Sequence, residues 1–245
     1  MSEPIRIAMW CGPRNISTAM MRSFGARADT HVVDEPFYAA YLARTGVDHP
    51  MREEAMASQP TDPDQVIADL FAPLPAGKSV FYQKHMTHHM LDGFDLSWTP
   101  RVRNAFLIRA PEAVLASYAK KYENVDLDMI GLPRQVEIFT HCADQLGAAP
   151  PVLETPTLLA DPRAMLTKLC DALGLSFDEA MLSWKPGIHE TDGVWAPAWY
   201  DAVAASTGFA PAAREPSFDE LPDRLKLIAE KARPLYERLK AHAIQ

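Results

Sequence analysis

The segment that most constrains the fold is residues 5–27, IRIAMWCGPRNISTAMMRSFGAR. Its first six residues form a mostly apolar run of strand length. Gly12-Pro13 then forces a turn, because glycine tolerates positive φ and proline fixes its own φ. Ser17 or Thr18 is placed to cap a helix that continues through Phe24. The segment therefore predicts a strand, a tight loop and a helix start, an arrangement whose backbone N–H groups and helix dipole suit a phosphate or sulfate.

Composition indicates an ordinary globular chain. Its 245 residues are 48% hydrophobic and 23% charged, and we expect one domain over residues 1–245, with an irregular flap at about 184–217 and a C-terminal helix at about 219–243. No apolar run approaches the ~18 residues that cross a bilayer. The net charge of −8 disfavours nucleic acid as a partner. A homo-oligomer is left open.

The N-terminus and the cysteines predict a cytoplasmic protein. The first residues carry an acid and lead directly into a strand, so we expect no signal peptide. Three cysteines are too few and too widely spaced for a disulfide framework or a cysteine-based zinc site, and they favour a reducing compartment. We interpret the one in the loop as a small loop residue rather than a nucleophile. The three are Cys11, Cys142 and Cys170.

Short β-rich runs alternate with helical patterns along the chain. The runs begin near residues 5, 30, 79, 104 and 151. This alternation predicts an α/β fold with helices on both faces of a mainly parallel sheet of about five strands. Helices are expected over residues 49–58, 63–71, 111–122 and 132–146, and from residue 162 onward. Asp62 is expected to cap the second of these and Asp161 to precede the last.

A second basic element occurs at the fourth strand, in the segment NAFLIRAPEAVLASY. Arg109 ends the strand, Pro111 opens a helix, and Ser117 follows eight residues after the arginine. The planar fork of arginine binds phosphate oxygens in pairs, so the element suits a second phosphate. The alternative is that Arg109 pairs with an acid such as Glu112 and that Ser117 is ordinary helix surface.

The two elements together resemble those of sulfotransferases. The first loop lacks the Gly-Lys-Ser/Thr triplet of magnesium-dependent nucleotide loops. It is similar instead to the 5′-phosphosulfate loop of that family, although Asn15 and Ile16 stand where the family usually has Ser-Gly. Arg109 and Ser117 resemble the element that holds the 3′-phosphate of 3′-phosphoadenosine 5′-phosphosulfate (PAPS). Glu35-Pro36, residues 83–90 and residues 152–175 also resemble family segments.

The resemblance implies a PAPS-dependent sulfotransferase on a three-layer fold like that of P-loop nucleoside-triphosphate hydrolases. Adenosine 3′,5′-bisphosphate would be the product, and no metal is expected. The acceptor would be a small molecule with a hydroxyl or amine, which the sequence does not identify. The residues implied to bind the donor are Gly12, Pro13, Arg14, Asn15, Ile16, Ser17, Thr18, Arg109 and Ser117.

Four residues are expected to act on the transferred group. Arg14 would place a cation on the bridging and sulfuryl oxygens, and Lys84 is a further contact for the sulfuryl group. The base is Glu35 or His85, each just past a predicted strand end. We favour Glu35, because its Glu-Pro context matches and because an aromatic surrounding raises the pKa of a carboxylate toward neutrality. His88 and His89, next in the chain, are interpreted as surface or acceptor-pocket residues.

Several alternatives remain open at this point. Aromatic residues near the predicted site suit a sugar, phenol or lipid head group, but they equally suit the core. A small-metabolite phosphotransferase is one other enzyme class. Another interpretation is a catalytically silent nucleotide-binding or interaction protein with the same fold. It is favoured by the presence of Ile16 in place of glycine. A pyridoxal enzyme is remote, because no lysine has a recognisable Schiff-base context. The aromatic residues are Phe37, Tyr38, Tyr41, Trp195 and Trp199.

Overall fold

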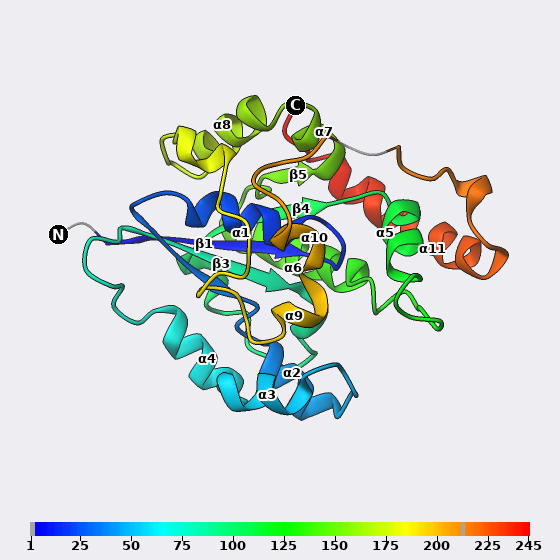
Figure 1. Cartoon of the computed structure of the whole chain (residues 1–245), viewed down its shortest axis with the longest axis horizontal. Coiled ribbons are helices and arrows are strands. Elements are labelled where there is room, and N and C mark those ends of the chain that lie inside the picture. Colours follow the sequence, from blue (N-terminus) through cyan, green and yellow to red (C-terminus); the bar gives the residue numbers. More distant parts are fainter. Residues whose placement is uncertain (1–2, 212–213) are drawn as a thin grey trace.

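A five-stranded parallel sheet forms the centre of the chain (Figure 1). The structure is a computed structural model that describes residues 3–211 and 214–245. The strands lie in the order β2-β3-β1-β4-β5, and every neighbouring pair is parallel. The predicted parallel sheet is thus confirmed. Its strands are β1 (Ile5–Cys11), β2 (Thr30–Asp34), β3 (Val80–Met86), β4 (Arg103–Ile108) and β5 (Val152–Glu154).

Helices cover both faces of this sheet and make three layers. Successive residues of a strand point to opposite faces, so Met9 and Trp10 of β1 enter different cores. Met9 packs with Phe24 and Leu166 under α1, α7 and α8. Trp10 packs with Phe106 and Phe139 under α5, α6 and α11. The helices are α1 (Ser17–Gly25), α5 (Pro111–Tyr118), α6 (Leu132–Leu146), α7 (Thr155–Ala160), α8 (Pro162–Ala172) and α11 (Asp223–Lys240).

Three short helices follow β2 at the edge of the sheet: α2 (Tyr38–Thr45), α3 (Arg52–Ser58) and α4 (Pro63–Leu70). Asp62 caps α4 as predicted, since its side chain accepts a hydrogen bond from the N–H of Asp64. The helix expected from residue 49 begins only at Arg52, because Met51 has a φ of 60° and a left-handed backbone. Neither α2 nor α7 was anticipated. The 3₁₀ helices are η1 (Thr87–His89), η2 (Thr99–Arg101), η3 (Glu179–Leu182) and η4 (Phe218–Glu220).

Residues 184–211 form the segment that we call the flap. It contains two short helices, α9 (Ala196–Trp199) and α10 (Asp201–Ala204), so it is more regular than the sequence predicts. Trp195 and Tyr200 of the flap pack against Tyr38 and Leu42 of α2. Residues 212–213 of the expected flap lie outside the described residues. Within the described ranges, none of the helices has the length and apolar character needed to cross a membrane.

Candidate functional site

A cavity of about 380 Å³ lies at the edge of the sheet where the strands end. Its walls come from the loop after β1, the ends of β2, β3 and β4, helix α5 and the flap. Open parallel sheets bind their ligands at this edge. The Lys, Arg, Asp and Glu residues among those that line the cavity are Arg14, Glu35, Lys84 and Arg109.

The loop between β1 and α1 contains two residues with positive φ. Arg14 has a φ of 62° and Ile16 a φ of 55°. A left-handed backbone is rare for a β-branched residue such as isoleucine, so Ile16 is strained. It adopts the conformation that glycine takes without cost, at the position where the sulfotransferase resemblance places glycine. Left-handed residues that alternate with right-handed ones turn their N–H groups toward a concave anion site.

The start of α1 differs from the sequence prediction. Neither Ser17 nor Thr18 caps the helix: α1 begins at Ser17, its N-cap is Ile16, and no side chain makes a capping hydrogen bond. The residues of this first turn line the cavity. The side chain of Thr18 instead accepts a hydrogen bond from Lys84, with Nζ and Oγ1 3.1 Å apart. The helix start thus presents uncapped N–H groups at the cavity wall.

Two residues that were expected in the loop, Cys11 and Gly12, do not line the cavity. A Cβ at Gly12 would lie 2.4 Å from the backbone oxygen of Ile130, so the close approach of the two backbones requires glycine. Cys11 was expected in the loop but is the last, fully buried residue of β1. Burial raises the pKa of its thiol to about 12, so the thiol stays protonated at neutral pH.

The two basic elements meet although they are far apart in the sequence. Nε of Arg14 donates to Oγ of Ser117 at 2.9 Å, and Nη1 of Arg109 donates to the backbone oxygen of Arg14 at 3.0 Å. Glu112 pairs with Arg233 and not with Arg109. The alternative is correct in that Arg109 pairs with an acid, although that acid is Glu215 and not Glu112. It is wrong about Ser117, whose hydroxyl accepts a hydrogen bond from Arg14.

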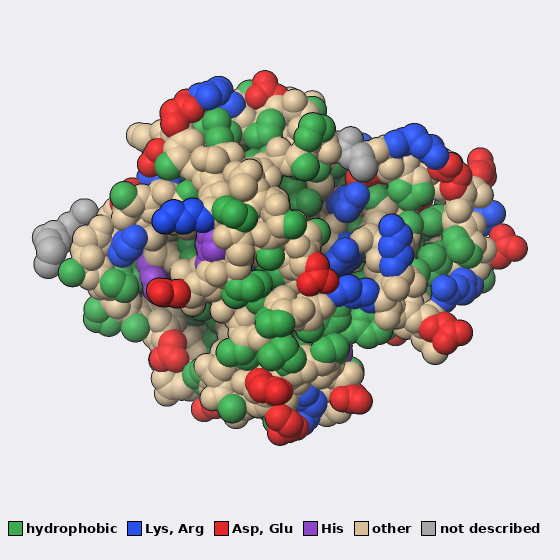
Figure 2. All heavy atoms as spheres, viewed as in Figure 1, with side chains coloured by type: hydrophobic (Ala, Val, Ile, Leu, Met, Phe, Trp, Pro, Cys, Tyr) green, Lys and Arg blue, Asp and Glu red, His purple; other side chains and the backbone are tan. Residues whose placement is uncertain are grey.

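Where the two basic elements meet, the two cations, Arg14 and Arg109, outnumber their carboxylate partners. Arg109 pairs with Glu215, with Nε and Oε1 2.7 Å apart. Arg14 has no carboxylate partner in residues 3–211 and 214–245. Burial, and then the nearby Arg109, lowers the pKa of Arg14. On this face of the molecule, Lys and Arg side chains gather beside the flap, in the region of α5 (Figure 2). An anion is the ligand that two adjacent guanidinium groups favour.

Lys84 forms a buried ionic centre beside the loop. Its Nζ lies 2.9 Å from Oδ1 of Asp34, 2.8 Å from Oε1 of Glu35 and 2.6 Å from the hydroxyl of Tyr200. Burial alone would lower the pKa of Lys84, but the two carboxylates outweigh it and hold the pKa well above its usual value. With its bond to Thr18, this ammonium group links the first turn of α1, β2 and the flap.

Glu35 directly follows β2 and has a φ of 44°. Burial raises the pKa of its carboxyl; Asp34 raises it further, while Lys84 opposes the change. Its Oε1 is bound to Lys84, and its Oε2 lies 3.8 Å from Nδ1 of His89. Glu35 lines the cavity, so its carboxylate is within reach of a bound ligand.

His85, the other expected base, lies away from the cavity. Its ring stacks on Trp10 with centroids 4.5 Å apart, and its Nε2 lies 3.2 Å from Oε1 of Gln83. Burial lowers the pKa of His85 to about 3. The reason is that β3 continues to Met86, so the consecutive residues Lys84 and His85 point to opposite faces of the sheet. His85 therefore faces the core that contains Trp10.

The cavity wall beyond Glu35 is aromatic. His88 and His89 lie there, and the ring of His89 is stacked between Tyr38 and Tyr41, at 4.7 and 4.8 Å. Burial lowers the pKa of both histidines, so both are neutral at pH 7. Of the aromatic residues considered for an acceptor pocket, Phe37 belongs to the core instead. Those that line the cavity are Tyr38, Trp195 and Trp199.

The parallel sheet, the loop before α1 and the basic residues beside that loop define a three-layer α/β protein with a candidate anion site at one edge of its sheet. Comparison with known proteins supports this class and narrows it. Residues 5–243 match the family described as the sulfotransferase domain. The chain belongs to this family.

Two solved structures of sulfotransferases share the fold of this chain. A sulfotransferase domain from the curacin biosynthetic pathway matches with a TM-score of 0.55, covering 98% of this chain and 99% of that one at 14% identity. A sulfotransferase from Alicyclobacillus acidocaldarius matches with a TM-score of 0.56, covering 98% and 96% at 14% identity. At this level of identity the likeness concerns the fold, and it confirms the predicted fold class.

Curated relatives are more similar in sequence. Branched-chain-amino-acid aminotransferase-like protein 1 of Arabidopsis thaliana is 37% identical over 99% of this chain and 43% of its own length. The corresponding protein 2 is 34% identical over 96% of this chain and 41% of its own length. The chain thus spans less than half the length of these relatives, so their names describe longer proteins.

Sequence reasoning missed two members of the ionic centre. Asp34 is the last residue of β2, and its contact with Lys84 follows from the parallel register, in which the two residues are partners. That pairing requires β3 to extend at least to Lys84. Tyr200 carried no signal beyond its aromatic side chain, because its position depends on how the flap folds back over β2.

Proposed function

We propose that this chain transfers a sulfuryl group from PAPS to a hydroxyl or amine of a small acceptor. The observation that carries the proposal is the set of contacts among Arg14, Arg109 and Ser117, beside the uncapped start of α1. These residues line the same cavity as Lys84 and Glu35. A donor with phosphates at both the 3′ and 5′ positions needs two anion sites a short distance apart. Arg109 and the loop are two such sites.

The donor's two phosphates would have different partners. The 5′-phosphosulfate would bind the N–H groups of the loop and of the first turn of α1, with the hydroxyls of Ser17 and Thr18 beside them. The 3′-phosphate would bind Arg109 and Ser117. Arg14 belongs to the loop that would bind the 5′-phosphosulfate, and it also contacts both residues of the proposed 3′-phosphate site, Ser117 and Arg109. Its unpaired charge would stabilise the bridging oxygen as negative charge develops there.

The transfer step requires a base and a cation on opposite sides of the sulfur. The acceptor oxygen attacks sulfur, the bond from sulfur to the bridging phosphate oxygen breaks, and adenosine 3′,5′-bisphosphate leaves with that electron pair. Glu35 would take the acceptor proton, since its raised pKa favours proton uptake. Lys84, held between Thr18 and Glu35, would contact the sulfuryl oxygens. His85 has no role here, because it faces the core.

The proposal is tested by incubating the chain with PAPS and measuring release of adenosine 3′,5′-bisphosphate. Phenol, glucose and benzylamine serve as acceptors of three kinds, with sulfated product detected by mass spectrometry. We expect sulfated product from at least one acceptor and none from Arg14→Ala. ATP with magnesium is the comparison donor. Phosphorylated product from ATP would contradict the proposal. Tight binding of PAPS without release of adenosine 3′,5′-bisphosphate in the presence of any acceptor would also contradict it.

A further inference from the structure

Tyr200, on the flap, makes more polar contacts in the ionic centre than its aromatic character predicts. Its hydroxyl lies 2.6 Å from Nζ of Lys84 and donates to Oδ2 of Asp34 at 2.7 Å. It also accepts a hydrogen bond from Nε1 of Trp195 at 3.2 Å and lies 3.3 Å from Oε1 of Glu35. Tyr200 as a whole is only 6% exposed. These contacts place a flap hydroxyl in direct contact with Lys84.

We propose that Tyr200 is a positioning residue, whose hydroxyl holds the ammonium group of Lys84 against Glu35 and the loop, so that the site is complete only when the flap is closed. The inference rests on the proposed function. Lys84 has a long flexible side chain and three N–H donors, so its direction depends on its partners. Three of those partners lie on the body of the protein, at Thr18, Asp34 and Glu35. Tyr200 is the partner that the flap supplies.

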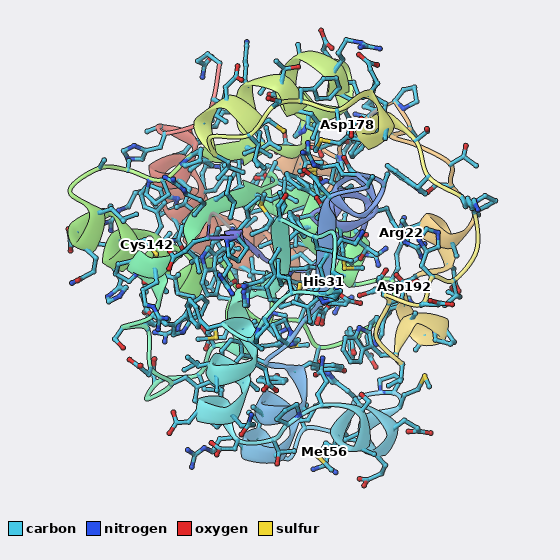
Figure 3. The ribbon with its side chains drawn as sticks, turned by 90° about the vertical axis from the view of Figure 1, so that its left-hand side faces the viewer. Arg22, His31, Met56, Cys142, Asp178 and Asp192 are labelled. Atoms are coloured by element: carbon cyan, nitrogen blue, oxygen red, sulfur yellow. The ribbon has the colours of Figure 1, made fainter. Side chains whose placement is uncertain are left out.

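Further contacts hold the flap in this closed position. Arg22 of α1 and Asp192 of the flap form a buried ion pair with 2.5 Å between Nη2 and Oδ2, and the two side chains lie side by side in Figure 3. The backbone N–H of Gly193 donates to Oδ2 of Asp34 at 2.9 Å, the same oxygen that accepts from Tyr200. Asp34 therefore binds both the flap and Lys84, which couples closure of the flap to the place of the ammonium group.

The ring of Tyr200 and its hydroxyl have separable roles. Nζ of Lys84 lies 4.7 Å from the centre of the ring, and the ring packs with Trp195 and Ala196 in the cluster under the flap. Tyr200→Phe keeps this packing and removes only the hydroxyl. Tyr236→Phe is the matched control, because Tyr236 is also buried and its hydroxyl also bonds a carboxylate, that of Glu154, away from the cavity.

The experiment compares both variants with the unmodified chain in three measurements. These are bisphosphate release from PAPS with phenol as acceptor, calorimetric affinity for adenosine 3′,5′-bisphosphate, and hydrogen–deuterium exchange of residues 190–204. For Tyr200→Phe we expect turnover to fall at least ~10-fold with the bisphosphate affinity changed less than ~2-fold, and exchange of the flap to quicken. Tyr236→Phe should leave turnover and flap exchange unchanged.

The outcomes separate this inference from the proposed function. If Tyr200→Phe keeps full turnover, the inference is wrong and the proposed function stands. A parallel loss of turnover and bisphosphate affinity would also overturn it, because it would indicate a general disturbance of the site. If the unmodified chain releases no bisphosphate with any acceptor, the proposed function fails. In that case, hydrogen–deuterium exchange of residues 190–204 decides whether the hydroxyl of Tyr200 holds the flap. Unchanged exchange in Tyr200→Phe would overturn the inference as well.

Discussion

Nε of Arg14 donates to Oγ of Ser117 at 2.9 Å, across 103 positions of sequence. The bond joins the loop after β1 to helix α5 after β4, and these strands are neighbours in the sheet. Parallel neighbours end at the same edge, so their following loops are brought together. The two basic elements of the sequence are therefore one site, with Arg14 between them.

Glu215 should compete with the ligand for Arg109. Its carboxylate lies 2.7 Å from Nε of Arg109, where the proposed 3′-phosphate would bind. We expect Glu215→Gln to tighten binding of adenosine 3′,5′-bisphosphate by ~3–10-fold at low salt, with a smaller effect at high salt because ions screen the pair. Calorimetry at two salt concentrations measures this. Glu220→Gln, which removes an exposed partner of Arg214, is the control and should change nothing.

Turnover should depend on pH through Glu35. Burial raises the pKa of this carboxyl, and a base must be ionised, so turnover should rise with pH as the pH passes the raised value. Glu35→Gln should lose ~10²–10⁴-fold in turnover and abolish this acid limb, while bisphosphate affinity changes little. A pH profile of the unmodified chain and the variant is the measurement. An acid limb that persists in Glu35→Gln would assign the base to another group.

Three histidines with a lowered pKa, His85, His88 and His89, should make the fold sensitive to acid. Burial lowers the pKa of His85 and of His88 from 6.5 to about 3. Between these values the unfolded chain binds a proton that the folded chain does not, so stability falls as pH falls. Each histidine should remove ~1.4 kcal/mol of unfolding free energy per pH unit below about 6. Urea unfolding at pH 7 and pH 5 tests this.

A variant isolates one of these contributions. His85→Phe keeps an aromatic ring against Trp10 and cannot bind a proton. The difference in unfolding free energy between pH 7 and pH 5 should be smaller in this variant, by the amount that protonation of one histidine contributes. An unchanged difference would mean that His85 is not the group that titrates. The absolute stability of the variant is a separate quantity, because the bond to Gln83 is lost.

Gly12 should be intolerant of a side chain. An added Cβ would lie 2.4 Å from the backbone oxygen of Ile130. Relief of this clash must move backbone, and we expect Gly12→Ala to destabilise the fold by ~1–3 kcal/mol and to weaken bisphosphate binding. Gly25→Ala is the control, since its Cβ would make only ordinary contacts of 3.6 Å with Val32. Equal unfolding midpoints for the two variants would contradict the account.

Much of the fold followed from local sequence signals. Turn residues and alternating strand and helix patterns predicted the five strands, and the register that brings Arg14 to Ser117 follows from a parallel sheet. Strand ends were harder to predict. Lys84-His85-Met86 contains polar residues that read as a loop, yet all three are buried in β3. That error of a few residues is why His85 was placed at the cavity.

The flap was beyond sequence reasoning for a different reason. Its position depends on long-range pairs, such as Arg22 with Asp192 and Tyr200 with Asp34, that no local pattern encodes. Glu215 is a similar case, because it reaches Arg109 from 106 positions away. The cap of α1 was predicted incorrectly because Ser17 is a good capping residue, whereas the loop places Ile16 in a left-handed backbone at that position.

The most direct test of the central claim is calorimetric titration with adenosine 3′,5′-bisphosphate and with 5′-AMP. The unmodified chain, Arg109→Ala and the control Arg233→Ala are compared, because Arg233 pairs with Glu112 outside the cavity. We predict that the unmodified chain and Arg233→Ala bind the bisphosphate at least ~10-fold more tightly than AMP, and that Arg109→Ala loses this preference. Equal affinity of the unmodified chain for the two nucleotides would contradict a 3′-phosphate site at Arg109 and, with it, PAPS as the donor.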